Sequence, residues 1–254
     1  MKKNFYFKEI VKRQNLLRDF VLSFFLSLSS YPRLLIEVFI RKDFGERYFR
    51  LSSAITVFVI VASLPLLSRF FTEDYSEEGE TSFLTGSLTL YIYLCAFMFF
   101  SIKRHMETRR NPSVFDLEKY SLYNGTIHPF FNDLKIANKS VPTRLIETVL
   151  EPAPFFIAGV ILSLLHQQLG GLLIFCSVFY SLSQVAQYER GDNYVMDMLD
   201  QMILNKGLED AFVNDVSPEE NMCIRPLGRK PADREMRRRL LSNMMEEEEV
   251  FVVT

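Results

Sequence analysis

Three long stretches without a single charged side chain constrain the fold of this 254-residue chain more than any other feature. They are residues 51–68, 81–102 and 152–188, which hold 18, 22 and 37 residues. An α-helix rises about 1.5 Å per residue, so roughly 20 apolar residues cross the hydrocarbon core of a bilayer. The first two stretches therefore fit one crossing each, and the third is long enough for two short crossings.

The middle of the third stretch predicts a turn. His166–Gly171 is polar and contains two glycines, which favours a hairpin of two helices at Pro152–Leu165 and Leu172–Tyr188. A soluble protein with buried helices is disfavoured, because soluble helices rarely stay uncharged on every face for several turns. The sequence thus predicts an all-α integral membrane protein with four transmembrane helices arranged as two hairpins, and with amphipathic or interfacial helices at both ends.

The positive charges indicate an orientation. Residues 1–50 carry 11 Lys and Arg, residues 103–151 carry 8 and residues 189–254 carry 9, whereas residues 72–80 carry none and are acidic. Lys and Arg are retained on the cytoplasmic side, so we expect both termini in the cytoplasm. The expected organisation is a basic interfacial segment (1–50), a first hairpin (51–102) with an acidic outer loop (72–80), a cytoplasmic loop (103–151), a second hairpin (152–188) and a cytoplasmic tail (189–254).

Phe20–Ile40 is apolar but ambiguous. A cleaved signal peptide and a fifth crossing are both alternatives, and each conflicts with the basic residues on one side of the segment. The favoured interpretation is a pair of amphipathic pieces in the cytoplasmic interface, broken near Tyr31-Pro32 because proline disrupts a helix.

Basic residues in the expected cytoplasmic segments are candidates for contact with anionic lipid or with a partner: Arg33, Arg41, Lys42, Arg47, Arg109, Arg110, Arg237, Arg238 and Arg239. In the tail, the pattern predicts an amphipathic helix over Asp192–Asn205 that ends at Gly207, and a last charged helix over Ala232–Glu249. This last helix is either ordered by a partner or left as a solvated tail.

The sequence contains no motif that is typical of a catalytic or metal-binding site. The cysteines (Cys95, Cys176 and Cys223) and the histidines (His105, His128 and His166) have no metal-binding spacing, and no phosphate-binding loop or catalytic motif occurs. The net charge of −2 excludes a chain-wide polybasic nucleic-acid binder. We therefore predict no catalytic, metal or cofactor site and no direct nucleic-acid binding, and the uncharged crossings count against an ion-coupled transporter.

Small and amide side chains in the last two crossings are candidates for helix–helix contact: Gly159, Ser163, Ser177, Ser181, Gln184 and Gln187. Their contacts are either within the chain or between copies of a homo-oligomer.

Three strings support a resemblance: PRLLIEVFIRKDFGERYF, EPAPFFIAGVIL and YVMDMLDQMI. Together they make residues 32–204 resemble small multipass membrane proteins encoded on bacterial conjugative elements. The resemblance implies a partner in a DNA-transfer or secretion apparatus and transfers no functional residue. The resemblance also implies a location in the bacterial inner membrane. The leading hypothesis is a non-enzymatic, four-crossing scaffold or adaptor of that membrane, which contacts the bilayer and other membrane or cytoplasmic proteins. The alternative is a small oligomeric channel or transporter lined by Ser177, Ser181, Gln184 and Gln187, and a membrane enzyme comes third.

Overall fold

The computed structural model describes residues 2–4, 6–12, 15–72, 77–108, 120–132, 135–136 and 139–247. The long helices are α1 (Leu16–Ile40), α2 (Leu51–Thr72), α3 (Glu77–Thr108), α6 (Ala153–Leu164), α7 (Gln168–Phe212) and α8 (Arg234–Met244). Short helices are η1 (Phe7–Val11), α4 (Pro129–Asn132), α5 (Thr143–Leu145) and η2 (Ile146–Leu150), of which η1 and η2 are π-helices. The strands β1 (Lys2–Asn4) and β4 (Met245–Glu247) pair antiparallel, as do β2 (Lys135–Ile136) and β3 (Lys139–Ser140).

Four helical stretches are long and apolar enough to cross a membrane: Leu16–Ile40, Gly86–Thr108, Thr143–Leu164 and Gln168–Phe212. A shorter apolar stretch, Leu51–Pro65, lies in α2. Apart from strands of two or three residues, the regular structure is helical. The predicted class, a helical multipass membrane protein, is therefore confirmed.

The break predicted near Tyr31-Pro32 is wrong. Helix α1 runs without interruption through Pro32. Its second half is held by tertiary packing: Leu35 and Ile36 are almost fully buried, and the Tyr93 hydroxyl of α3 donates a hydrogen bond to the Leu35 carbonyl oxygen, 2.7 Å away. Neighbouring helices that supply such contacts are what allow a helix to continue past a proline.

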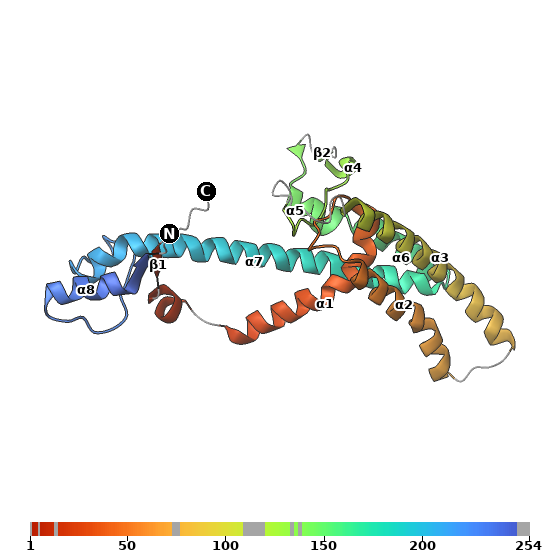
Figure 1. Cartoon of the computed structure of the whole chain (residues 1–254), viewed down its shortest axis with the longest axis horizontal. Coiled ribbons are helices and arrows are strands. Elements are labelled where there is room, and N and C mark those ends of the chain that lie inside the picture. Colours follow the sequence, from red (N-terminus) through yellow and green to blue (C-terminus); the bar gives the residue numbers. More distant parts are fainter. Residues whose placement is uncertain are drawn as a thin grey trace. The chain divides into compact units, whose positions relative to one another are not determined.

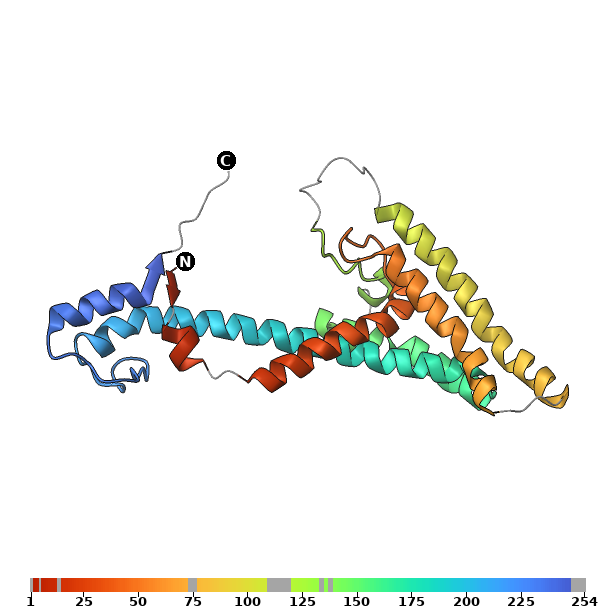
Figure 2. The ribbon, with the colours of Figure 1, turned by 60° about the horizontal axis from the view of Figure 1, so that its bottom comes forward.

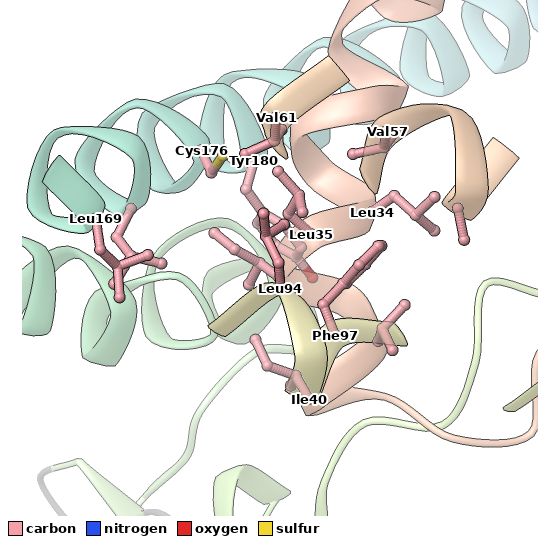
Figure 3. Close-up of a cluster of buried hydrophobic side chains, with 14 of the residues drawn as sticks. Leu34, Leu35, Ile40, Val57, Val61, Leu94, Phe97, Leu169, Cys176 and Tyr180 are labelled. Atoms are coloured by element: carbon pink, nitrogen blue, oxygen red, sulfur yellow. The ribbon is translucent and has the colours of Figure 1, made fainter. Parts of the chain in front are cut away.

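Residues 21–188 form one compact unit, called unit 2 here. In it α2 and α3 lie side by side (Figures 1 and 2), and the Tyr91 hydroxyl donates to the Ala62 carbonyl oxygen. The core collects side chains from four helices, α1, α2, α3 and α7, as Figure 3 shows for Leu35, Val61, Leu94 and Tyr180. This packing gives the apolar stretches a common interior.

Helix α7 differs from the predicted pieces in two places. The turn after α6 is shorter than expected, because α7 already begins at Gln168 and so contains Gly170. At the other end α7 continues through Gly207, which is therefore not a helix cap. A Cβ atom at Gly207 would lie 2.3 Å from Cδ1 of Ile224, so the close packing of residues 221–224 on the helix explains this glycine.

Residues 1–20 and 189–254 form the second compact unit, called unit 1 here, which therefore contains both ends of the chain. Lys2, Lys3 and Asn4 pair with Glu247, Glu246 and Met245. The small apolar core of this unit has nine buried residues: Tyr6, Phe7, Leu204, Leu208, Ala211, Phe212, Val213, Ile224 and Leu241. Helix α8 packs beside the end of α7 in this unit (Figure 1) and ends before the predicted Glu249, since residues 245–247 form β4.

Candidate functional site

A buried group of charged side chains lies in unit 2 and centres on Arg41, the first residue after α1. The Arg41 side chain has no exposed surface. Its Nη2 donates to Oε2 of Glu151 at 2.5 Å and to Oε1 of Glu147 at 3.1 Å, its Nε donates to Glu151 at 3.2 Å, and its Nη1 donates to the Asn124 carbonyl oxygen at 3.4 Å. Every guanidinium nitrogen of Arg41 is thus engaged.

The acidic partners of Arg41 come from η2 and from the turn that follows it. Glu147 lies in η2 and Glu151 follows its last residue, so both carboxylates reach the same guanidinium. Two tyrosines of α7 complete the arrangement: the Tyr180 hydroxyl donates to Oε2 of Glu151 at 2.6 Å, and the Tyr188 hydroxyl donates to Oε2 of Glu147. The group therefore ties α1, η2 and α7 together.

A second buried ion pair lies eight residues back along α1. Nε of Arg33 lies 2.6 Å from Oε1 of Glu37, one helical turn later, and both side chains are almost fully buried. The Tyr48 hydroxyl accepts a hydrogen bond from Nη2 of Arg33 and donates to the Glu37 carboxylate at 2.9 Å. Burial, followed by the adjacent Glu37 carboxylate, raises the pKa of the Tyr48 phenol above its ordinary range, so this tyrosine stays neutral.

Together these residues are called the arginine–glutamate cluster: Arg33, Glu37, Arg41, Tyr48, Glu147, Glu151, Tyr180 and Tyr188. A buried charge is costly unless it is paired and hydrogen-bonded. In this cluster both guanidinium groups and all three carboxylates have such partners. Its chemistry is therefore that of a structural lock rather than of a free nucleophile or base.

The expectation that Arg33 and Arg41 face lipid head groups is wrong, because the acidic partners in the cluster bury both side chains. Of the other candidates in this region, Lys42 and Arg47 are exposed. Arg109 and Arg110 lie outside the described residues.

The three candidate arginines of α8 lie in unit 1. Arg238 and Arg239 are exposed, whereas Arg237 donates to the Pro231 carbonyl oxygen and, at 2.6 Å, to Oδ2 of Asp215. Nζ of Lys230 binds the other oxygen of Asp215 at 2.7 Å. The hydrogen bonds from Lys230 and Arg237 lower the pKa of Asp215.

The small residues of α6 lie against the start of α7. A Cβ atom at Gly170 would be 2.4 Å from the Ser163 backbone nitrogen and 2.8 Å from the Gly159 carbonyl oxygen. The two helices therefore approach closely within the chain at these three positions.

The polar candidates of α7 divide into two groups. Ser177 and Gln184 are buried, and among the described residues neither the Ser177 hydroxyl nor the Gln184 side-chain nitrogen has a hydrogen-bond partner. Ser181 is half-buried and Gln187 is exposed. The structure therefore brings only two of the four proposed pore-lining side chains into the interior.

Sequence reasoning missed the acidic and tyrosine members of the cluster. Only the spacing of Arg33 and Glu37, four residues apart, was a readable signal for a pair on one helix face. The contact between Arg41 and Glu151 joins residues that are 110 positions apart in the sequence, so no local sequence pattern predicts it.

The described residues contain no group of three or more His, Cys, Asp and Glu side chains able to hold a metal ion. Comparison with known proteins gave no matching family model, no matching curated protein and no matching solved structure.

Proposed function

We propose that this protein is a non-enzymatic scaffold or adaptor of the bacterial inner membrane, and that it belongs to a larger complex such as a conjugative DNA-transfer or secretion apparatus. The observation that carries the proposal is the arginine–glutamate cluster. Its buried ion pairs and hydrogen bonds hold α1, η2 and α7 together. Such a satisfied polar network makes the membrane part rigid, as a scaffold requires.

In this proposal the membrane part consists of two hairpins, α2 with α3 and α6 with α7. The side-by-side packing of α2 and α3 supports the first hairpin, and the close approach at Gly170 supports the second. Both ends of the chain lie in the cytoplasm, an assignment supported by the excess of Lys and Arg in residues 1–50 and 189–254.

Unit 1 supplies the contact surface for a protein partner. On α7, Val195, Leu199, Met202 and Ile203 share one face, and their side chains are 57%, 49%, 49% and 41% exposed. Contiguous exposed apolar residues in a water-facing unit are typical of protein-interaction sites. We propose that this face, called the α7 face below, holds a neighbouring subunit of the complex.

Copurification in mild detergent tests this function. The tagged wild-type chain, extracted from cells that express its genomic neighbours, is expected to bring specific membrane or cytoplasmic proteins with it. The Leu199→Glu variant should lose them, whereas Asp200→Asn, an exposed neighbour off the α7 face, should retain them. Recovery of the wild-type chain alone and monomeric would contradict the scaffold proposal.

A small oligomeric channel is the second candidate. It is favoured by the buried Ser177 hydroxyl and Gln184 side-chain nitrogen, which have no hydrogen-bond partner in the part of the chain that the structure describes. Buried polar groups without partners are costly unless water or a permeating species satisfies them. Flux through reconstituted wild-type protein that disappears with Gln184→Leu and persists with Gln187→Leu would support this candidate. An absence of flux in the wild type would eliminate it.

A further inference from the structure

The part of the arginine–glutamate cluster around Arg41 holds more negative than positive charge. Arg33 and Glu37 form an ion pair of their own, with Nε of Arg33 2.6 Å from Oε1 of Glu37. Arg41 instead binds two carboxylates, Oε2 of Glu151 at 2.5 Å and Oε1 of Glu147 at 3.1 Å. The side chains of Arg41 and Glu151 have no exposed surface, and that of Glu147 is 11% exposed. One buried guanidinium thus faces two buried carboxylates, called the Glu147–Glu151 pair below.

The other charged groups that the structure describes around this pair either have partners of their own or lie in water. On α3, Nη1 of Arg104 lies 2.9 Å from Oε2 of Glu107. On α5, the guanidinium of Arg144 lies 4.9 Å from the centre of the Tyr188 ring and is exposed, so water screens its charge. Residues 152–188, which include α6 and the first half of α7, carry no charge. The charged residues of the segment after α1 are exposed: Lys42, Asp43, Glu46, Arg47 and Arg50.

Gln184 of α7 lies on the face that contacts the pair. Tyr180 and Tyr188 donate to Glu151 and Glu147, respectively. Gln184 is four residues from each tyrosine, so helical periodicity places it between them on the same face. Its side chain is almost fully buried, and its nitrogen has no hydrogen-bond partner among the described residues. Buried polar groups of this kind are normally satisfied by an internal water, and a water at this point can exchange protons with the pair.

The hydrogen bonds of Glu147 can accommodate a proton without being lost. In the ionised state Oε1 of Glu147 accepts from Arg41 and Oε2 accepts from the Tyr188 hydroxyl. With a proton on Oε2, this oxygen donates to the Tyr188 hydroxyl oxygen and Oε1 still accepts from Arg41. A buried charge without a counterion is costly, and a buried carboxylate avoids that cost by taking up a proton.

We propose that the Glu147–Glu151 pair is a proton-binding site, which takes up one exchangeable proton from solvent in the folded protein and shares it between the two carboxyl groups. The partly exposed Glu147 side chain gives the site access to water. Because the pair ties α1, η2 and α7 together, proton uptake strengthens this junction and proton release weakens it. The packing of unit 2 therefore responds to pH. The inference holds for a scaffold and for a channel alike.

The sign of the pH dependence follows from the proton count. Above the range in which ordinary glutamates ionise, the folded chain holds one proton that the unfolded chain has released, so stability falls as the pH rises. Denaturant unfolding of the full-length protein in detergent, measured from about pH 5 upward, tests this. The unfolding equilibrium constant should rise about tenfold per pH unit until the folded pair has lost its proton.

The variant Glu147→Gln isolates the pair from other titrating groups. It places a neutral amide where the protonated carboxyl would be, and it leaves one carboxylate opposite Arg41. We expect this variant to lose the tenfold rise and to be more stable than the wild type at alkaline pH. Glu46→Gln is the matched control, since Glu46 is exposed, and it should keep the wild-type pH dependence. If Glu147→Gln also keeps that dependence, the inference is wrong.

Infrared spectroscopy of the folded protein tests the same site without unfolding it. The wild type and Glu46→Gln should show the C=O stretching band of a protonated carboxyl group at pH values where exposed carboxyl groups are ionised, and the band should disappear as the pH rises further. Glu147→Gln should lack it. Absence of the band in the wild type would overturn the inference. So would a stability that depends on sodium, compared with choline, but not on pH, because a metal cation would then balance the charge.

Discussion

Arg41 and Glu151 lie 110 residues apart in the sequence, yet Nη2 of Arg41 is 2.5 Å from Oε2 of Glu151, and neither side chain has any exposed surface. The pair joins the end of α1 to the residue that follows η2, and Tyr180 of α7 binds the same carboxylate oxygen. A charge in this position is stabilising only while its partner is present.

Replacing Arg41 by methionine should therefore destabilise the protein strongly, by about 3–5 kcal/mol, because Glu147 and Glu151 would be left buried without their cation. The loss is measurable as a lower midpoint of denaturant unfolding, followed by circular dichroism in detergent. Lys42→Met is the matched control, since Lys42 is exposed, and it should change stability by less than about 0.5 kcal/mol.

The triple variant Arg41→Met, Glu147→Gln, Glu151→Gln distinguishes a buried charge from lost packing. Removing the two carboxylate charges should recover a large part of the stability that Arg41→Met loses. The reason is that replacing all members of a buried ion group by neutral side chains destabilises a protein much less than removing one member alone. An equal or greater loss in the triple variant would contradict the assignment of the cluster as an electrostatic lock.

Adjacent glycines at the start of α7 should respond in opposite ways to alanine. A Cβ atom at Gly170 would lie within 3 Å of the backbone of α6, whereas one at Gly171 would meet nothing within 4 Å. Gly170→Ala should cost about 1–3 kcal/mol by forcing the helices apart, and Gly171→Ala should stabilise the helix by up to about 1 kcal/mol. Thermal unfolding of both variants measures the difference, and equal midpoints would mean that α6 and α7 do not pack closely here.

Acid should loosen unit 1 through Asp215. Hydrogen bonds from Lys230 and Arg237 lower the pKa of Asp215, so its stabilising contribution is present above the ordinary aspartate pKa. That contribution is lost as the pH falls through the lowered folded-state value, when the carboxylate becomes protonated. Amide hydrogen exchange in α8, measured at decreasing pH and corrected for the intrinsic exchange rate, should therefore show falling protection.

Asp215→Asn is the control for this pH dependence. The variant should show weaker protection of α8 at neutral pH and little further loss in the acid range. If protection of α8 falls with pH equally in the wild type and in the variant, the acid sensitivity comes from groups other than Asp215.

The sequence predicted the class of protein correctly because this class depends on a local property, the hydropathy of each segment. Charge-free stretches such as residues 81–102 specify apolar helices whatever the rest of the chain does. Helix continuity was not readable in the same way. Pro32 is a local signal for a break, but contacts from α3, such as the hydrogen bond from Tyr93 to Leu35, keep α1 intact.

The arginine–glutamate cluster shows why the sequence alone did not predict most of the candidate site. Arg33 and Arg41 are basic residues in a segment where the sequence predicts lipid contact. The structure buries both: Arg33 pairs with Glu37 on the same helix and contacts Tyr48, and Arg41 pairs with the distant Glu151. Gly207 is a similar case: it resembles a helix cap in sequence, yet its role is to admit Asn221 and Ile224 against a continuing helix. Long-range contacts decide both outcomes.

The most direct test of the account is labelling of single cysteines with a membrane-impermeant maleimide. In a background of Cys95→Ser, Cys176→Ala and Cys223→Ser, cysteine is introduced separately as Asn15→Cys, Ser217→Cys and His166→Cys. If the termini lie in the cytoplasm and the α6–α7 turn lies outside, positions 15 and 217 should react only in inverted inner-membrane vesicles, and position 166 should react only in intact spheroplasts. Labelling of positions 15 and 217 from opposite faces, or a chain that stays in solution without detergent, would contradict it.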